Sequence, residues 1–273
     1  MYESYWQLKQ KPFDNGADPR FYYPGESHQA ALLKLRYAVE NRRGGALLTG
    51  VSGSGKTLLA NMLRQSMGDD VQPFVRIVFP QMPCHELLGY LADQLMGLDQ
   101  TSREPNVQQS VWRIEQFLAE NSRQGRHAVV IVDEAHLIAD SPTLEALRLL
   151  LNFESGGAPP LTLILAGQTA LLPTLDRTPQ LEERLGVKCL IRPLTEKETA
   201  EYVSHRVKVG GATQTIFEPD AMPTLHALTH GVARRINRLC DLALLIGFAE
   251  ERKTLGVSHL EAVSQELVAV VPE

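Results

Sequence analysis

Residues 50–57 carry the clearest chemical signal in this sequence. They read Gly-Val-Ser-Gly-Ser-Gly-Lys-Thr, which matches the pattern G-x-x-x-x-G-K-[ST] in full. Glycines let a backbone turn closely around a polyphosphate and aim several N–H groups at it, and a following helix adds its positive amino-terminal end. We therefore expect this segment to bind the polyphosphate of a nucleotide together with Mg²⁺. The expected binding residues are Gly50, Val51, Ser52, Gly53, Ser54, Gly55, Lys56 and Thr57.

Within this loop, Lys56 and Thr57 have separate expected roles. The Lys56 ammonium would reach the β- and γ-phosphates, and the Thr57 hydroxyl would be a ligand of Mg²⁺. The alternative is a glycine-rich surface turn that matches the pattern by chance. The context speaks against it, because the apolar run 46–49 precedes the loop and an apolar helical pattern follows it over 58–63.

Two carboxylates, Asp133 and Glu134, follow the apolar run 129–132. Ligands in open α/β sheets bind at the carboxyl ends of the strands, where both acids would lie. Asp133 is then suited to hold the water shell of Mg²⁺, and Glu134 to polarise the attacking water. The same acids could simply end a strand or cap the next helix. Their pairing with a phosphate loop favours the catalytic interpretation.

The two acids continue into Ala135 and His136, which spells DEAH and invites comparison with a helicase. A helicase of that class carries a second motor domain of comparable size, with arginines that face the nucleotide. Only about 80 residues follow Pro193, and they are patterned as helices. We therefore exclude that class and interpret His136 as a polar residue that faces a helix.

Two further polar residues flank the last expected strands. Gln168 follows the apolar run 161–166, where it could contact the γ-phosphate or the attacking water, and where it equally fits an ordinary turn. Arg184 precedes the strand expected at 187–191. It could instead be a surface residue that pairs with a neighbouring glutamate, Glu182 or Glu183.

Three arginines within five residues open a helix expected over 232–250. Arg234 and Arg238 lie four residues apart on one face of this helix, opposite an apolar stripe. Such a cluster can bind the phosphate of a nucleotide or of DNA, or it can merely keep the helix soluble.

The chain alternates short apolar runs with helical patterns, which indicates a parallel sheet covered by helices on both faces. The expected strands are 46–49, 74–79, 128–132, 161–166 and 187–191, and the expected helices between them are 56–67, 85–97, 106–121, 142–153 and 170–185. Ser27 could cap an additional helix that runs through Val39. After Leu194 only helices are recognisable, at 195–209, 219–229, 232–250 and 258–269.

These patterns predict three regions. Residues 1–26 form an aromatic amino-terminal arm that packs on the core, residues 27–193 form an α/β domain, and residues 194–273 form a small helical domain. Dividing 273 residues by roughly 150 per domain agrees with one large domain and a smaller companion.

Composition excludes several classes of protein. With 44% apolar and 22% charged residues the chain is globular, and a net charge of −5 provides no overall basic field for nucleic acid or membrane. No apolar stretch approaches the roughly 20 residues that span a bilayer, and the first residues do not resemble a secretory signal. Three widely spaced cysteines argue against disulfides and against zinc. We expect a cytoplasmic protein.

Taken together, these motifs resemble those of the AAA+ ATPases over nearly the whole chain. The resemblance rests on the phosphate loop, on Asp133 and Glu134, and on the positions of Gln168, Arg184 and the Gly-x-x-Arg at 231–234. It implies that Gln168 is sensor 1, that Arg184 is a finger reaching the ATP of a neighbouring subunit, and that Arg234 is sensor 2. It also implies a P-loop α/β domain followed by a helical lid, and assembly as a ring or filament through the ATP site.

Within that family the sequence is most similar to the general secretion pathway protein A group, which includes ATPases of pilus and secretion systems. The similar stretches include Lys11-Pro12-Phe13, the run 18–22, Leu144-Glu145-Ala146-Leu147-Arg148 and the run 165–168. That group is close to transposition-regulator ATPases of the TnsC and MuB kind.

Two features depart from the family pattern. The family's lid usually reads Gly-x-Pro-Arg, whereas Ala233 stands at the proline position. Secretion-pathway members often add a membrane span and a periplasmic cell-wall-binding region, and neither is recognisable before Glu273. The chain is expected to be either a stand-alone member or the ATPase part of a longer protein.

Several functional hypotheses follow. The first is an Mg²⁺-dependent ATPase whose assembly drives or signals conformational change in a secretion, pilus or similar bacterial machinery, through a partner protein. The second is an ATP-gated adaptor that forms filaments on double-stranded DNA and recruits a transposase. A scaffold that binds ATP without useful turnover is a third. A P-loop metabolite kinase is a weaker fourth, because it explains neither Glu134 nor the arginine-bearing lid.

Overall fold

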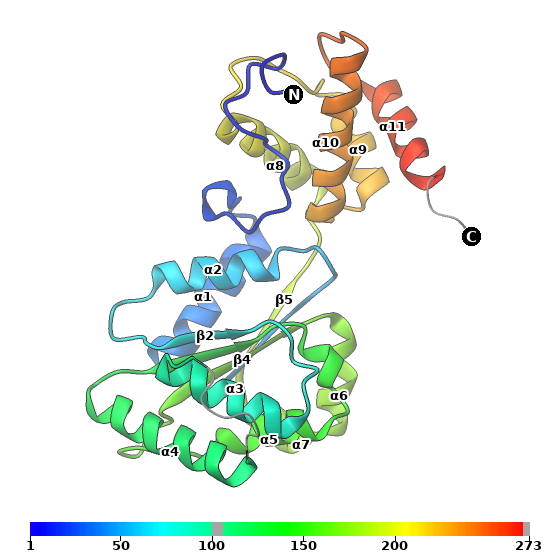
Figure 1. The fold of residues 1–273 in the computed structure, drawn as a ribbon. Coiled ribbons are helices and arrows are strands. Elements are labelled where there is room, and N and C mark those ends of the chain that lie inside the picture. Colours follow the sequence, from blue (N-terminus) through cyan, green and yellow to red (C-terminus); the bar gives the residue numbers. More distant parts are fainter. Residues whose placement is uncertain (100–105, 270–273) are drawn as a thin grey trace. The chain divides into compact units, whose positions relative to one another are not determined.

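The computed structural model describes residues 1–99 and 106–269, and the chain divides into two compact units (Figure 1). The first unit contains Met1–Glu26, Val51–Leu58 and Arg192–Glu273, and the second contains Ser27–Gly50 and Leu59–Ile191. The phosphate-loop segment thus groups with the chain ends, while the segments on either side of it belong to the second unit.

The second unit is built on a parallel five-stranded sheet, which confirms the predicted fold class. The sheet order is β2-β3-β4-β1-β5. The strands are β1 (Gly45–Gly50), β2 (Phe74–Ile77), β3 (Ala128–Val132), β4 (Leu161–Gly167) and β5 (Leu185–Ile191). Every residue of β1, β3 and β4 is buried, as expected for central strands of a parallel sheet that is covered on both faces.

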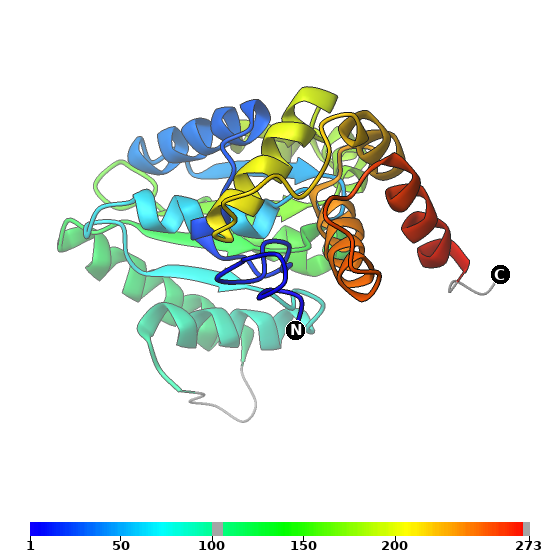
Figure 2. The same cartoon turned by 90° about the horizontal axis from the view of Figure 1, so that it is seen from above.

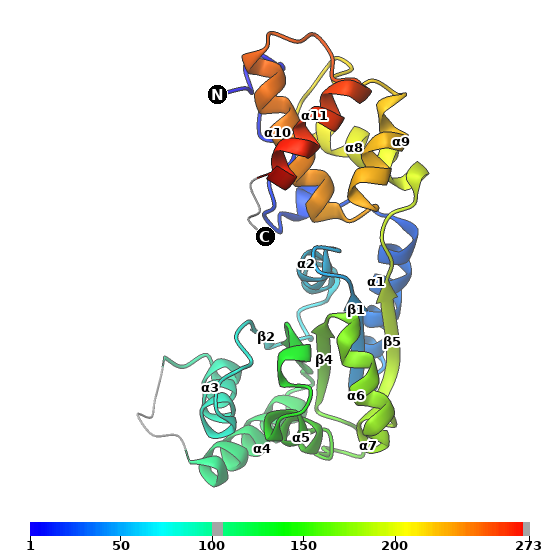
Figure 3. The same ribbon diagram turned by 90° about the vertical axis from the view of Figure 1, so that its right-hand side faces the viewer.

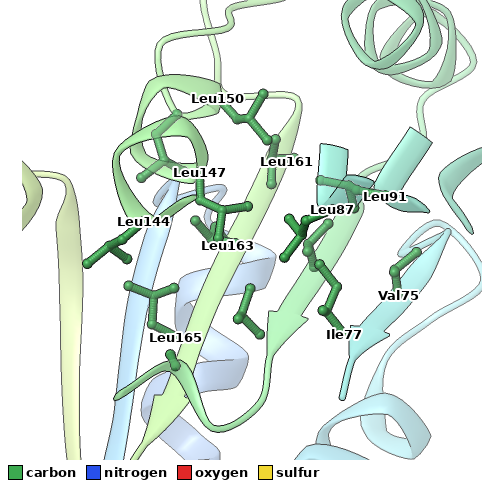
Figure 4. Close-up of a cluster of buried hydrophobic side chains, with 14 of the residues drawn as sticks. Val75, Ile77, Leu87, Leu91, Leu144, Leu147, Leu150, Leu161, Leu163 and Leu165 are labelled. Carbon is green, nitrogen blue, oxygen red and sulfur yellow. The ribbon is translucent and has the colours of Figure 1, made fainter. Parts of the chain in front are cut away.

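Helices of the second unit cover the sheet. They are α1 (Glu26–Glu40), α2 (Lys56–Ser66), α3 (Cys84–Met96), α4 (Val107–Arg123) and α5 (Pro142–Leu150), with α1 and α2 beginning in the first unit. Leucines of α3 and α5 meet alternate residues of β2 and β4 in one apolar cluster, shown in Figure 4. Alternate residues of a strand point to opposite faces of the sheet. The residues of β2 and β4 that lie between those in this cluster therefore face the other side of the sheet.

The register of the strands places the carboxyl ends of β1, β3 and β4 at one edge of the sheet. Thr49 pairs with Gly167, and Val132 pairs with Leu165. The chain therefore leaves β1, β3 and β4 at nearly the same level, and the residues that follow these strands lie at a shared carboxyl edge.

The first unit contains the helices α8 (Glu196–Val209), α9 (Ala221–Thr229), α10 (Ala233–Ala249) and α11 (Val257–Ala269). The last two lie side by side (Figure 2). These helices share an apolar cluster with the start of the chain, to which Tyr2, Trp6 and Phe13 contribute buried rings. The indole N–H of Trp6 donates to the carbonyl of Leu244 at 2.9 Å. The aromatic rings of the arm thus pack with the carboxyl-terminal helices, whereas we expected from the sequence that the arm would pack on the core of the α/β domain.

A buried guanidinium also holds the arm in this unit. Arg206 of α8 is 3% exposed and donates to the backbone carbonyls of Pro12 and Asp14. Its guanidinium carbon lies 4.5 Å from the centre of the Phe21 ring, within the range of a cation–π contact.

Three local expectations differ from the structure. Helix α1 begins at Glu26, so Ser27 lies in its first turn and is not its cap. Strand β2 ends at Ile77, and the two apolar residues after it are exposed. The segment 170–185 is not one helix.

That segment instead forms η3 (Thr169–Leu171), α6 (Leu172–Arg177) and α7 (Pro179–Glu182). Thr178 breaks the run with φ −128° and ψ 71°, because the ring of a proline disfavours helical geometry in the residue before it. In the described part of the chain, no helix combines the length and apolar character needed to cross a membrane.

Candidate functional site

The phosphate-loop segment leaves β1 at Gly50 and enters α2 at Lys56. Gly53 and Gly55 have φ of +78° and +94°, left-handed values that glycine adopts without strain. The Ser54 N–H donates to the Val51 carbonyl at 3.2 Å, which closes a tight turn. The Lys56 side chain is buried and its ammonium donates to the same carbonyl at 3.1 Å. The loop therefore curls around the lysine at the start of a helix.

The start of α10 contacts this loop within the first unit. The backbone N–H of Arg234 donates to the Gly53 carbonyl at 3.2 Å, and the guanidinium donates to the Ser52 hydroxyl at 3.4 Å. A Cβ on Gly53 would lie 2.5 Å from the Cβ of Arg234, so only glycine permits this approach. The arginine singled out from the sequence thus lies against the loop that is expected to bind phosphate.

Ala233 is the first residue of α10. Proline is favoured at that position because the first N–H of a helix has no partner within the helix. Alanine meets the same requirement, so the departure from the family's Gly-x-Pro-Arg pattern leaves the helix start intact.

In the second unit, Asp133 and Glu134 follow β3 as the sequence predicts. Asp133 is buried, and its Oδ1 accepts the backbone N–H of Glu134 at 3.0 Å. Glu134 has φ 50° and ψ 36°, a left-handed conformation that costs a non-glycine residue roughly 1–2 kcal/mol. Its side chain is 45% exposed. One acid is therefore held inside the sheet edge while the next points outward.

His136 belongs to this group of residues, although the sequence led us to interpret it as merely facing a helix. It lies in η2 (Ala135–Ile138), and its Nδ1 is 3.3 Å from Oε2 of Glu134. The same Nδ1 accepts the backbone N–H of Gln168 at 3.4 Å. Only the spelling DEAH pointed to this residue, and local spacing could not reveal a partner on another strand.

Gln168 follows β4 at the same sheet edge, as the strand register requires. Its backbone N–H donates to Nδ1 of His136, and its side chain is half-buried. Gln168 is also the residue directly before η3. The structure therefore brings Asp133, Glu134 and Gln168 together at adjacent strand ends.

Arg184 is not part of that group. It precedes β5, and Leu185 pairs with Gly45 at the beginning of β1, so Arg184 lies at the opposite, amino edge of the sheet. The side chain is exposed, and within residues 1–99 and 106–269 no ion-pair partner is found for it. Glu182, one of the two partners considered from the sequence, instead pairs with Lys188.

The two side chains expected to bind magnesium, Thr57 in the first unit and Asp133 in the second, each carry an oxygen donor. Mg²⁺ prefers oxygen ligands and is usually held by one or two protein groups together with phosphates. Asp133 and Thr57 supply a carboxylate and a hydroxyl. Across the residues described by the structure, no cluster of three or more His, Cys, Asp or Glu side chains could hold a metal ion by itself.

Comparisons with known proteins agree with this architecture. A family model described as an AAA domain matches residues 39–175. General secretion pathway protein A of Aeromonas hydrophila is 34% identical over 278 aligned residues, which cover 100% of this chain and 50% of that protein. The chain thus spans half the length of this curated relative.

Solved structures share the fold. The ORC2 protein of Aeropyrum pernix, in its ADPNP-ADP complexes, is 17% identical with a TM-score of 0.71, covering 95% of this chain and 72% of that one. The ORC1 protein of the same organism, in complex with DNA, is 19% identical with a TM-score of 0.65 over 88% and 65% of the two chains. The RuvB Holliday junction branch migration motor of Thermotoga maritima is 17% identical, with a TM-score of 0.60 over 88% and 69%. At such identities the likeness concerns the fold alone.

Proposed function

The chain belongs to the AAA domain family, and from this premise we propose that it binds ATP with Mg²⁺ and hydrolyses it as an assembly of several copies. The observation that carries the proposal is the shared sheet edge. Gly50, the last residue of β1 and the first of the phosphate-loop pattern, lies at this edge. Asp133 and Glu134 follow β3, and Gln168 follows β4, at nearly the same level.

Each residue has a defined role in this proposal. The N–H groups of the loop and the Lys56 ammonium bind the β- and γ-phosphates, and Arg234 adds a guanidinium at Ser52. Glu134 accepts a proton from the attacking water, and Gln168 orients that water or the γ-phosphate.

Thr57 and Asp133 are the residues that would hold Mg²⁺ between the protein and the phosphates. When bound, the ion neutralises charge on the β- and γ-oxygens. Asp133 suits this task because its buried carboxylate is fixed by the backbone N–H of Glu134.

Two variants separate binding from turnover. Lys56→Ala removes a charge-assisted contact worth about 1.5–3 kcal/mol and should weaken ATP binding about tenfold or more in an equilibrium titration with Mg²⁺. Glu134→Gln keeps the size of the side chain but loses its charge. It should bind ATP normally and hydrolyse it at least about 100-fold more slowly.

Lys253→Ala is the matched control, because Lys253 is an exposed lysine distant in sequence from the loop. It should leave both quantities unchanged. Unaltered ATP affinity in Lys56→Ala would refute the phosphate-loop assignment. Parent-level hydrolysis in Glu134→Gln would mean that another group is the base.

For the biological process, we propose a bacterial secretion, pilus-assembly or related machinery. The support is the 34% identity to General secretion pathway protein A across this whole chain. The ATPase would act there on a partner protein through conformational change.

A DNA-binding adaptor is the second candidate, and the start of α10 favours it. Arg235 and Arg238 are exposed there, and among the described residues neither side chain has an ion-pair or hydrogen-bond partner. Retention on double-stranded DNA with an ATP analogue, weakening with salt and lost in Arg235→Ala/Arg238→Ala, would support this candidate. Unchanged retention in that variant would contradict it.

A further inference from the structure

His136 connects two strand ends of the second unit, and the proposed function leaves it without a role. Its Nδ1 lies 3.3 Å from Oε2 of Glu134 and accepts the backbone N–H of Gln168 at 3.4 Å. The imidazole is 14% exposed, whereas the Glu134 side chain beside it is 45% exposed. Nδ1 of this largely buried ring therefore lies near two partners, the Glu134 carboxylate after β3 and the Gln168 N–H after β4.

Nδ1 cannot satisfy both partners at once. An N–H donor such as that of Gln168 needs a lone pair on Nδ1, which places the ring proton on Nε2. A carboxylate accepts only, so a hydrogen bond to Glu134 needs the proton on Nδ1 itself. The two hydrogen bonds are therefore mutually exclusive.

The junction is sterically built for this contact. A Cβ on Gly167 would lie 3.1 Å from the backbone N of His136 and 3.5 Å from its Nδ1. The absence of a side chain at the end of β4 thus lets the next N–H reach the imidazole. The preceding residue, Ala135, is fully buried in the apolar cluster, which anchors η2 in the core of the unit.

We propose that His136 is a positioning residue that couples the end of β4 to Glu134 by exchanging the hydrogen bond of Nδ1 between Gln168 and the carboxylate. The proposal rests on the proposed role of Glu134 as the base. While Nδ1 accepts from Gln168, the carboxylate remains available to water. When the end of β4 moves and the N–H is withdrawn, the ring changes tautomer: Nε2 gives its proton to solvent water, Nδ1 takes one from solvent, and the Nδ1–H then holds Glu134 away from water.

Three substitutions of His136 test which atom acts. Asparagine places an amide near the position of Nδ1, glutamine places one near Nε2, and leucine has similar bulk without a hydrogen bond. Leucine and glutamine leave the Gln168 N–H without its acceptor on Nδ1, so the end of β4 that orients water loses its anchor. We therefore expect His136→Leu and His136→Gln to lower kcat at least about tenfold, with ATP affinity within twofold of the parent. His136→Asn should stay within about threefold of the parent kcat. His85→Leu is the matched control, because His85 is an exposed histidine beside Glu86.

A kcat of His136→Leu equal to the parent, or better rescue by glutamine than by asparagine, would overturn the proposal. Equal losses in all three variants, accompanied by equal losses of Tm, would assign His136 a purely structural role and overturn it as well.

A second measurement does not depend on hydrolysis. In ¹⁵N spectra of labelled histidine, His136 should show an unprotonated Nδ1, and Gly167→Ala should shift that resonance while Gly186→Ala leaves it unchanged. A protonated Nδ1 that ignores Gly167→Ala would refute the coupling, even if Lys56 and Glu134 behave as proposed. Absent ATP binding with an intact Nδ1 signal would instead refute the proposed function alone.

Discussion

Glu134, the proposed catalytic base, has a strained left-handed backbone conformation. A left-handed conformation in a glutamate costs roughly 1–2 kcal/mol, and such strain is retained where the surrounding structure enforces it. Here the buried Asp133 carboxylate fixes the N–H of Glu134, and the carbonyl of Glu134 accepts the N–H of Leu137. The turn separates the directions of two consecutive acids, as the different roles that we propose for them require.

Sequence reasoning singled out Asp133 and Glu134 but not the contact between His136 and Gln168, for a physical reason. The acids are recognised by local spacing, because both follow one apolar strand. The histidine makes its hydrogen bond across strands, with Gln168, which is 32 residues away in the sequence. Strand order decides that encounter, and the order β3-β4 is a property of the sheet that no local pattern contains.

His127 makes the stability of the protein depend on pH. It is 2% exposed, and its Nε2 lies 2.8 Å from the Thr162 hydroxyl. Burial lowers the pKa of His127 from its ordinary 6.5 to about 4, with a smaller contribution from the charge of Arg42. The folded protein then binds fewer protons than the unfolded chain between these two values. Stability from this residue is complete above about pH 6.5 and is lost as the pH falls toward 4.

We expect the free energy of unfolding to fall by up to about 2 kcal/mol between pH 7 and pH 5 on account of His127. His127→Gln keeps a hydrogen-bonding side chain but does not titrate, so it should flatten this part of the profile. Urea unfolding at the two pH values measures the effect. An equal pH dependence in parent and variant would assign it to other groups.

At the scale of elements, the strands and most helices were recognisable, because their apolar runs are buried where the periodicity indicates. The segment 170–185 was not, since its apolar residues have helical spacing although Pro179 prevents a continuous helix. The sequence also could not show where the amino-terminal arm packs. Its aromatic residues are apolar enough for any core, and only the structure places Trp6 among the helices α8–α11.

The arm therefore contributes to the stability of the helical unit. Trp6 is 1% exposed, donates a hydrogen bond to the carbonyl of Leu244, and packs edge-to-face with Tyr5, with the two ring centres 5.0 Å apart. Replacing a buried tryptophan by alanine removes a large apolar surface and leaves a cavity, at a cost of about 3–5 kcal/mol.

Trp6→Ala should lower the free energy of unfolding by about that amount in urea titrations. The other tryptophan supplies a matched control, because Trp112 on α4 is 62% exposed. Trp112→Ala should change stability by no more than about 0.5 kcal/mol. Equal effects of the two substitutions would show that the arm is dispensable.

At the scale of the whole molecule, the parallel sheet separates Arg184 from the acids of its own chain. Arg184 precedes β5 at the amino edge, while Asp133 and Glu134 follow β3 at the carboxyl edge. Figure 3 shows α7 beside the beginning of β5, and Arg184 lies between these two elements in the sequence. The seven residues of β5 span roughly 20 Å at about 3.3 Å per residue. An arginine side chain does not bridge that distance, so any catalytic role of Arg184 belongs to the site of another copy.

Mixtures of variants test this role in trans. An arginine delivered by a neighbour neutralises charge that develops on the γ-phosphoryl group, and such fingers are worth about 10³–10⁵ in rate. Arg184→Ala and Glu134→Gln should each be nearly inactive alone. Mixed together they should recover activity, because some interfaces then join an intact arginine to an intact glutamate. The specific activity of the parent should also rise with concentration as assemblies form.

A surface role for Arg184 predicts the opposite pattern. An exposed arginine contributes at most about 1 kcal/mol to stability and nothing to catalysis. Lys188→Ala is a suitable control, because it removes a neighbouring surface cation that pairs with Glu182. It should hydrolyse ATP at the parent rate. Constant specific activity from nanomolar to micromolar protein, without recovery in the mixture, would make Arg184 a surface residue and the protein an ATPase that works as a monomer.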